Sequence, residues 1–248
     1  DSKTNTLITG CMSTIIPNNT TSIGSDAFYH ISKLTSINIP GSVTSIGATA
    51  FRGTRITSIE IPDNVTSIGF GAFWDCERLT SVKLPNNLSA IESYLFDFCT
   101  NLTSIVIPNS VTSIGEKSFA YCRNLNSIEI PEKVTSIGHS AFYLCTNLRQ
   151  ITCHATEPPV CEKQAFEQVD RLNCKLIVPE GSEEAYMAAN EWRGFYTADG
   201  IEGLEDESIV DVYNLQGVTV KRQVRMKDLQ GTLPKGIYII NGKKIAVR

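Results

Sequence analysis

Cysteine is the residue type in this sequence whose number and spacing could support chemistry. Four of the eight cysteines, Cys76, Cys99, Cys122 and Cys145, lie 23 residues apart, and Ile31 falls in the same column in an earlier repeat. Side chains of adjacent strands are about 4.8 Å apart, whereas a disulfide prefers a Cβ separation near 3.8 Å. The spacing therefore predicts one inward-facing column of free thiols that act as small apolar side chains.

The other cysteines and the three histidines form no metal-ligand pattern. Cys153, Cys161 and Cys174 break the 23-residue spacing, and a Cys153–Cys161 disulfide is a candidate in an oxidising compartment. No pair has C-x-x-C spacing, and the histidines are scattered. The sequence also lacks a Gly-x-Ser-x-Gly elbow, a phosphate loop and a dinucleotide glycine pattern. We therefore expect no metal, no cofactor, no catalytic residues and no enzymatic activity.

Composition excludes several classes of protein. The chain has 248 residues, 42% of them hydrophobic, and a formal net charge of −4. The hydrophobic content is too high for intrinsic disorder, and the apolar residues are too dispersed for a membrane span of about 20 residues. A net negative charge argues against nucleic acid as a partner. These totals indicate a globular chain and leave its activity open.

A repeat of about 23 residues organises the first two thirds of the sequence. An apolar residue followed by proline recurs six times, first at Ile16-Pro17. The spacings between successive prolines of this series are 23, 22, 23, 23 and 23 residues. An Ile-Gly pair recurs in phase, with Glu92 replacing glycine once. A third marker is a phenylalanine, at Phe28, Phe51, Phe73, Phe96, Phe119 and Phe142. Three markers in phase over six periods predict a solenoid.

Each repeat unit has room for two short strands and a turn. In one unit, Leu102-x-x-Ile105-x-Ile107 has the apolar spacing of a strand, which Pro108 ends because it lacks a backbone donor. Residues 111–114 form a second short run, and a tight arc follows at the phenylalanine. A single coil cannot bury its apolar edge, so neighbouring coils must stack about 4.8 Å apart.

The repeat resembles a known family. The pattern Leu-x-x-Ile-x-Ile-Pro-x-x-Val-x-x-Ile-Gly-x-x-Ala-Phe-x-x-Cys-x-x-Leu is similar to the BspA-like (Treponema-type) leucine-rich repeat of bacterial surface proteins, over residues 7–152. Two departures, a missing residue between Phe51 and Ile56 and the glutamate at Glu92, are expected to distort the coil locally. The resemblance implies a leucine-rich-repeat solenoid, mainly β with short parallel strands and little helix, in residues 1–152. It also implies export, an extracellular or outer cell-surface location, and adhesion to matrix proteins or cells. The chain starts at Asp1 without an initiator methionine, as expected of a mature or trimmed chain.

The remaining residues predict a cap and a small β module. Residues 153–197 are interpreted as the C-terminal cap of the solenoid, with a short helix at 182–192 whose N-cap is Ser182. Residues 198–248 are interpreted as an acidic linker and an antiparallel β module, with strands around a turn at Gln216-Gly217 and a hairpin turn at Asn241-Gly242. This module resembles the C-terminal tails of secreted proteins of anaerobic bacteria.

Aromatic residues on the arcs are the candidate binding residues. They follow the repeated phenylalanines by one or two positions and form a predicted rim: Tyr29, Trp74, Phe98, Tyr121 and Tyr143. Aromatic side chains offer large contact areas at low entropic cost, although these could also pack between neighbouring arcs. We hypothesise a non-enzymatic adhesion protein whose partner is an extracellular protein or matrix component. The alternatives are a carbohydrate-binding accessory protein and a structural spacer for the C-terminal module. The oligomeric state stays open.

Overall fold

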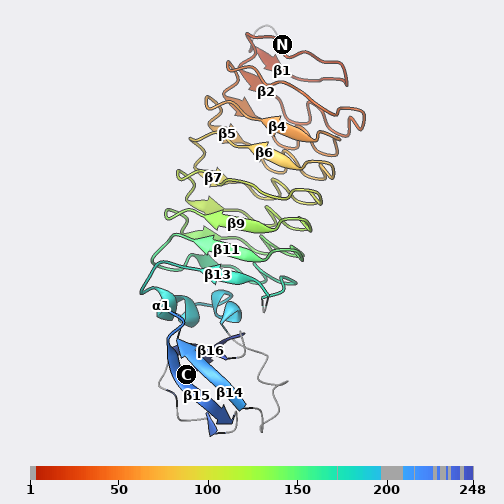
Figure 1. The fold of residues 1–248 in the computed structure, drawn as a ribbon. Helices are drawn as coiled ribbons and strands as arrows, with labels where there is room; N and C mark the ends of the chain where they lie inside the picture. Colours follow the sequence, from red (N-terminus) through yellow and green to blue (C-terminus); the bar gives the residue numbers. More distant parts are fainter. Residues whose placement is uncertain are drawn as a thin grey trace.

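The predicted solenoid is present. The computed structural model describes residues 4–171, 173–196, 209–214, 216–225, 228–229, 233, 236–240 and 243–247. Coils of nearly equal width stack along one axis, with almost no helix, and make about seven turns (Figure 1). Two columns of short parallel strands run along the stack, joined by arcs at the repeated phenylalanines.

One strand column is built from the Ser-Ile pair of each repeat. Its strands pair in parallel with identical register, so that Ser22 is opposite Ser45 and Ile23 is opposite Ile46. The isoleucines point into the core and the serines lie at the surface. The strands are β1 (Thr6–Leu7), β2 (Ser22–Ile23), β3 (Ser45–Ile46), β5 (Ser67–Ile68), β7 (Ala90–Ile91), β8 (Ser113–Ile114), β10 (Ser136–Ile137) and β12 (Val160–Cys161).

The other strand column precedes the repeated prolines. Its strands are β4 (Ser58–Glu60), β6 (Ser81–Lys83), β9 (Ser127–Ile130), β11 (Gln150–Cys153) and β13 (Lys175–Ile177). Strands β13, β11 and β9 form one parallel sheet, and β4 pairs with β6. Burial alternates along each strand because successive side chains point to opposite faces. The solenoid therefore has one apolar core and one polar strand face.

The arcs carry a ladder of phenylalanine rings through the core. The six predicted rings and Phe166 are all fully buried, with successive ring centroids 5.1 to 5.7 Å apart and interplanar angles of 3° to 19°. The backbone joins the arcs as well: Phe96 N–H donates to the Ser118 carbonyl (2.8 Å), and Phe98 N–H donates to the Ala120 carbonyl (2.9 Å). Each arc is therefore fixed to the next by both stacking and hydrogen bonds.

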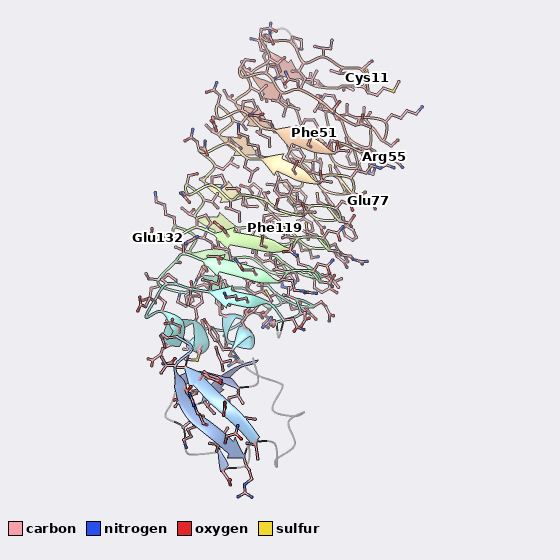
Figure 2. All side chains as sticks on the ribbon, viewed as in Figure 1. Cys11, Phe51, Arg55, Glu77, Phe119 and Glu132 are labelled. Atoms are coloured by element: carbon pink, nitrogen blue, oxygen red, sulfur yellow. The ribbon has the colours of Figure 1, made fainter. Side chains whose placement is uncertain are left out.

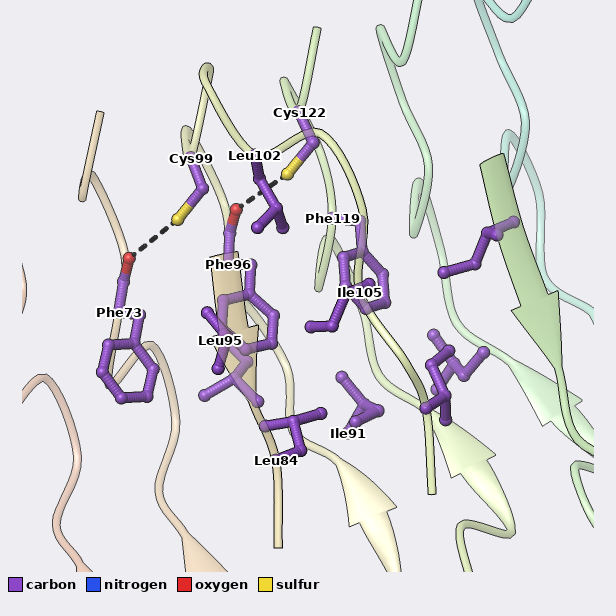
Figure 3. Packing of buried hydrophobic residues seen from close by; sticks show 14 of the residues in the cluster. Phe73, Leu84, Ile91, Leu95, Phe96, Cys99, Leu102, Ile105, Phe119 and Cys122 are labelled. Carbon is purple, nitrogen blue, oxygen red and sulfur yellow. Dashed lines mark hydrogen bonds between the residues drawn. The ribbon is translucent and has the colours of Figure 1, made fainter. Parts of the chain in front are cut away.

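The predicted column of buried free thiols is confirmed. Cys76, Cys99, Cys122 and Cys145 are free and fully buried. Each thiol donates to the carbonyl of a phenylalanine in the preceding arc, at sulfur–oxygen distances of 3.1 to 3.2 Å; Figure 3 shows this for Cys99 with Phe73 and for Cys122 with Phe96. Burial raises the pKa of the Cys76 thiol to about 12, and it raises the pKa values of the other three as well. These thiols are structural.

The regular stacking is interrupted at Glu92. Strand β5 ends one sheet and β7 begins the next, although they lie on consecutive coils. At the equivalent position of neighbouring coils, a Cβ on Gly69 or Gly115 would lie 2.5 to 2.6 Å from a backbone nitrogen of the preceding coil. Only glycine permits the backbones of two neighbouring coils to approach this closely. The Cβ of Glu92 therefore holds the coils of β5 and β7 apart. The arc ladder continues across the same coils, since Phe73 N–H donates to the Leu95 carbonyl (3.1 Å).

The strand columns continue beyond residue 152 before two short helices cover the last coil. Helix α1 (Glu183–Ala188) is shorter than the predicted helix, and the Ser182 side chain makes no capping hydrogen bond, contrary to expectation. The 3-10 helix η1 (Trp192–Phe195) follows. The Trp192 ring lies 5.0 Å from that of Phe166, and its Nε1–H donates to the Pro159 carbonyl (2.8 Å). An aromatic cover thus ends the phenylalanine ladder.

The C-terminal residues form the expected small antiparallel sheet. Strands β14 (Ile209–Asn214), β15 (Thr219–Arg225), β16 (Gly236–Ile240) and β17 (Lys243–Val247) are ordered β15-β14-β16-β17. Val210 and Val212 belong to its own small core. The predicted turn at Gln216-Gly217 joins β14 to β15. Residues 241–242, the other predicted turn, lie outside the described residues, although Ile240 and Lys243 on either side are paired.

Candidate functional site

The strand face offers small polar and charged side chains. Lys83 forms an ion pair with Glu60 on the preceding coil, and His154 Nε2 lies 3.8 Å from a carboxylate oxygen of Glu129. Val106 is the large apolar exception and is 80% exposed. Exposed ion pairs of this kind contribute little free energy, and their charges already have partners. The strand face therefore has few groups free to recognise another molecule.

The first part of the predicted rim is a cluster of four aromatic side chains and one arginine on four consecutive arcs. The Trp74 ring centroid lies 6.4 Å from that of Phe70 and 5.3 Å from that of Tyr94, and Phe70 and Tyr94 are 5.0 Å apart. The Arg52 guanidinium lies over the Trp74 ring at 3.6 Å and over the Tyr29 ring at 5.5 Å. Tyr29 and Phe70 are each 44% exposed. We call these five side chains the Trp74 cluster.

The cluster depends on where the repeat places a large or a small side chain. Phe70 directly follows an Ile-Gly pair, where Ser25 and Ala48 lie in the preceding repeats. Gly71 has φ +57° and packs against Trp74, since a Cβ there would lie 3.4 Å from the indole, in van der Waals contact with it. Phe70, Tyr94 and Arg52 were not among the predicted site residues. For Phe70 and Tyr94 the signal is a large side chain where the preceding repeats hold smaller ones, whereas Arg52 occupies the same repeat position as Tyr29 and Trp74.

The second part of the rim is a stack on the following arcs. The Phe98 and Tyr121 rings are stacked with centroids 4.0 Å apart, and the Tyr143 ring meets Tyr121 edge-on at 5.4 Å. The Arg123 guanidinium lies over the Tyr121 ring at 5.8 Å. We call Phe98, Tyr121 and Tyr143 the Tyr121 stack. The structure therefore separates the five predicted rim residues into two groups, each with an arginine.

Asp97 lies between these two groups. It occupies the arc position of Trp74 one coil later, is only 3% exposed, and has a carboxylate oxygen without a hydrogen-bond partner. Burial raises the pKa of the Asp97 carboxyl to about 7, opposed by the positive charges of Lys117 and Arg52. Tyr94, by hydrogen bonding to Lys117, raises the pKa of that lysine. The rim thus contains a carboxyl group that changes charge near neutral pH.

The remaining predicted chemistry lies away from the rim. Cys153, at the end of β11, and Cys161, at the end of β12, are free thiols here, and burial raises the pKa values of both. Their disulfide stays a prediction. Cys11 is exposed, and hydrogen bonds from Ser13 and Thr14 lower its pKa to about 7. Across the described ranges, no group of three or more histidine, cysteine or acidic side chains is arranged to hold a metal ion.

In the part of the chain that the structure describes, none of the helices is both long enough and apolar enough to cross a membrane.

Comparison with solved structures gives the same architecture. A leucine-rich repeat protein of Eubacterium ventriosum is 28% identical with a TM-score of 0.56, and the match covers 62% of this chain and 42% of that one. The pneumococcal vaccine antigen PcpA is 18% identical with a TM-score of 0.50, over 70% of this chain and 42% of that one. A leucine-rich cell surface protein of Faecalibacterium prausnitzii is 29% identical with a TM-score of 0.37, over 70% and 61%.

The chain therefore spans less than half the length of the Eubacterium protein. No curated protein matches the sequence. The model of the BspA type leucine-rich repeat region matches in six copies, over residues 8–125 and 89–187. Proteins of this kind are typically not enzymes and generally mediate binding to other proteins. Because these matches cover most of the sequence, the chain belongs to the BspA-type leucine-rich repeat family.

Proposed function

We propose that this chain is an exported, non-enzymatic adhesion protein of a bacterial surface, and that it binds an extracellular protein through the rim of its arcs. The observation that carries the proposal is the Trp74 cluster, in which an arginine is held between tyrosine and tryptophan rings at the surface. Tryptophan, tyrosine and arginine are the residues that most often dominate the binding energy of protein interfaces. The Tyr121 stack provides a second anchor of similar composition on the adjacent arcs.

Backbone conformation fixes where these aromatics leave the arcs. Phe98 and Tyr121 both have φ +59°, and Tyr94 has φ +60°. The same left-handed conformation recurs at the position of Phe98 in other arcs, which hold His30, Gly53, Asp75 or Leu144 there. The rings of the rim are therefore held on a backbone geometry that the fold repeats.

Ring accessibility favours a protein over a neutral glycan as the partner. A sugar stacks on a free ring face, but Arg52 covers one face of Trp74 at 3.6 Å. Phe98 and Tyr121 turn faces toward each other at 4.0 Å. These clusters present ring edges, tyrosine hydroxyl groups and guanidinium donors to a partner. These groups suit the mixed apolar and polar surface of another protein.

The test is a binding screen of the purified protein against extracellular-matrix proteins and polysaccharides, followed by variants. For a captured matrix protein, Trp74→Ala should weaken binding by about 30-fold or more, because interface anchors contribute about 2 kcal/mol or more. Val106→Ala, on the strand face, is the control and should leave the affinity unchanged. Lost glycan binding with retained protein binding in Trp74→Ala would overturn the proposal. No ligand in either panel would favour the spacer role.

A further inference from the structure

The arcs that carry the Trp74 cluster also carry a row of exposed cations. Lys33, Arg55 and Arg78 each immediately precede the repeated leucine or isoleucine that begins the next strand run, and all three are exposed. We call these three residues the basic stripe. Figure 2 shows Arg55 on the arc side of the solenoid, with Glu132 on the opposite side.

Backbone hydrogen bonds put the stripe in register. Each of its cations lies two residues before a threonine, at Thr35, Thr57 and Thr80. Thr57 N–H donates to the Thr35 carbonyl (3.2 Å), and Thr80 N–H donates to the Thr57 carbonyl (2.9 Å). The cations therefore follow one another on consecutive coils, whose backbones are about 4.8 Å apart. Like charges that neighbour across strands destabilise a fold.

The stripe forms no ion pair in the part of the chain that the structure describes: none of the ion pairs there involves Lys33, Arg55 or Arg78. The turns at residues 25–33, 48–55 and 70–78 contain three acids, Asp26, Asp75 and Glu77, against the four cations of the stripe and Arg52. An excess of positive charge on one face is notable in a chain whose net charge is −4.

The same column carries no charge in the later repeats. Its residues there are Asn101, Asn124 and Asn147, whose amides are joined: Asn124 donates to Asn101 (3.1 Å), and Asn147 donates to Asn124 (3.4 Å). The fold thus accepts a neutral, hydrogen-bonded side chain at this position. The cations are confined to the coils of the Trp74 cluster, and Arg55 is three residues from Arg52, a reach of at most about 11 Å.

We infer that the basic stripe and the Trp74 cluster form one surface whose partner is an acidic polypeptide segment. The inference rests on the proposed function, since it names the chemistry of the protein bound at the rim. Cluster side chains contact apolar and aromatic groups of the partner, and the stripe pairs with its carboxylates. A polypeptide fits better than an acidic polysaccharide because Arg52 covers the ring face of Trp74 on which a sugar could stack.

The experiment measures binding of the full chain to poly-L-glutamate, with hyaluronate as the uronic-acid polysaccharide and dextran as the uncharged probe. The stripe variant carries Lys33→Asn, Arg55→Asn and Arg78→Asn, the residue that the later coils hold in this column. The matched control loses three cations of the C-terminal module, through Lys221→Gln, Arg222→Gln and Arg225→Gln. Circular dichroism verifies that each variant is folded. If the triple variant does not fold, the double variant Arg55→Asn/Arg78→Asn replaces it.

We expect the stripe variant to bind poly-L-glutamate about tenfold more weakly than the wild type at low salt, with the control unchanged. Wild-type binding should also weaken as NaCl is raised. An equal loss in both variants, or no binding by the wild type, overturns the inference. If the wild type binds hyaluronate more tightly than poly-L-glutamate, and the stripe variant loses that binding, the partner is not a polypeptide.

A matrix protein from the screen separates this inference from the proposed function. If the stripe variant captures that protein with wild-type affinity while Trp74→Ala does not, the acidic partner is refuted and the adhesion role stands. If the wild type captures no matrix protein, the proposed function fails whatever poly-L-glutamate does. If neither the stripe variant nor Trp74→Ala captures the matrix protein, the result supports both the acidic partner and the adhesion role.

Discussion

Replacing Asp97 by asparagine should make the solenoid more stable at alkaline pH. Burial raises the pKa of this carboxyl from 3.8 to about 7, so the folded chain holds a proton that the unfolded chain releases. A folded state that binds the extra proton loses stability as pH rises between these two values. Each tenfold difference in proton affinity corresponds to about 1.4 kcal/mol, which sets an upper limit of about 4 kcal/mol above pH 7. Solvent and the charges of Lys117 and Arg52 screen the carboxylate, so we expect about half of this limit.

The assay is urea unfolding of wild type and Asp97→Asn at a series of pH values from 3.5 to 8.5. The two proteins should have nearly equal stability at the acid end, where the carboxyl is protonated in both folded and unfolded chains. The variant should gain about 2 kcal/mol over the wild type by pH 8. A difference that does not vary with pH would refute the burial argument. A variant that is less stable at pH 8 would show instead that the Asp97 carboxylate is held in a stabilising ion pair.

Four further expectations concern the phenylalanine core, the interruption at Glu92 and the thiols. Phe119→Ala should lower the free energy of unfolding by about 3–5 kcal/mol, because its buried ring stacks on both sides; a loss below about 1 kcal/mol in chemical denaturation would contradict the ladder. Glu92→Gly should let β5 and β7 pair and slow hydrogen exchange of their amides, whereas unchanged exchange would show that the Cβ does not hold the coils apart. Cys11 should be the first thiol to react with Ellman's reagent in the native chain, and its rate should fall below pH 7; fast reaction of the buried column would be inconsistent with the fold. Non-reducing peptide mapping of protein from an oxidising compartment should recover Cys153 joined to Cys161, and separate peptides would exclude that disulfide.

The repeat architecture could be predicted from the sequence because the same marker residues recur at the same positions of each coil. A phenylalanine, an Ile-Gly pair and a proline in constant phase require stacked coils, and the inward thiol column followed from spacing alone. The end of the solenoid was harder to predict. Ser182 has the type and the neighbours of a helix N-cap, yet tertiary packing buries it and the helix ends at Ala188. There the packing of Tyr186 and Trp192 against the last coil determines the structure, and the local preference of Ser182 for a capping hydrogen bond does not.

The rim was predicted in part. Spacing from the repeated phenylalanine located Trp74 and Tyr121, but it did not show that Arg52 lies on Trp74 or that Phe70 belongs to the same cluster. Those contacts depend on side-chain directions in left-handed arc positions and on the packing of Gly71 against Trp74, which a linear pattern does not encode. Departures from the repeat were informative: Phe70, Gly71 and Glu92 fall within one coil of each other.

The measurement that most directly tests the rim as the binding face is hydrogen exchange, followed by mass spectrometry, of the chain with and without a captured matrix protein. If the rim binds the partner, exchange should slow in arc residues 70–76 and 93–98, which carry Phe70, Trp74 and Tyr94 of the Trp74 cluster and Phe98 of the Tyr121 stack. Slower exchange confined to the strand face at 104–107 and 127–130, with the arcs unaffected, would contradict this prediction.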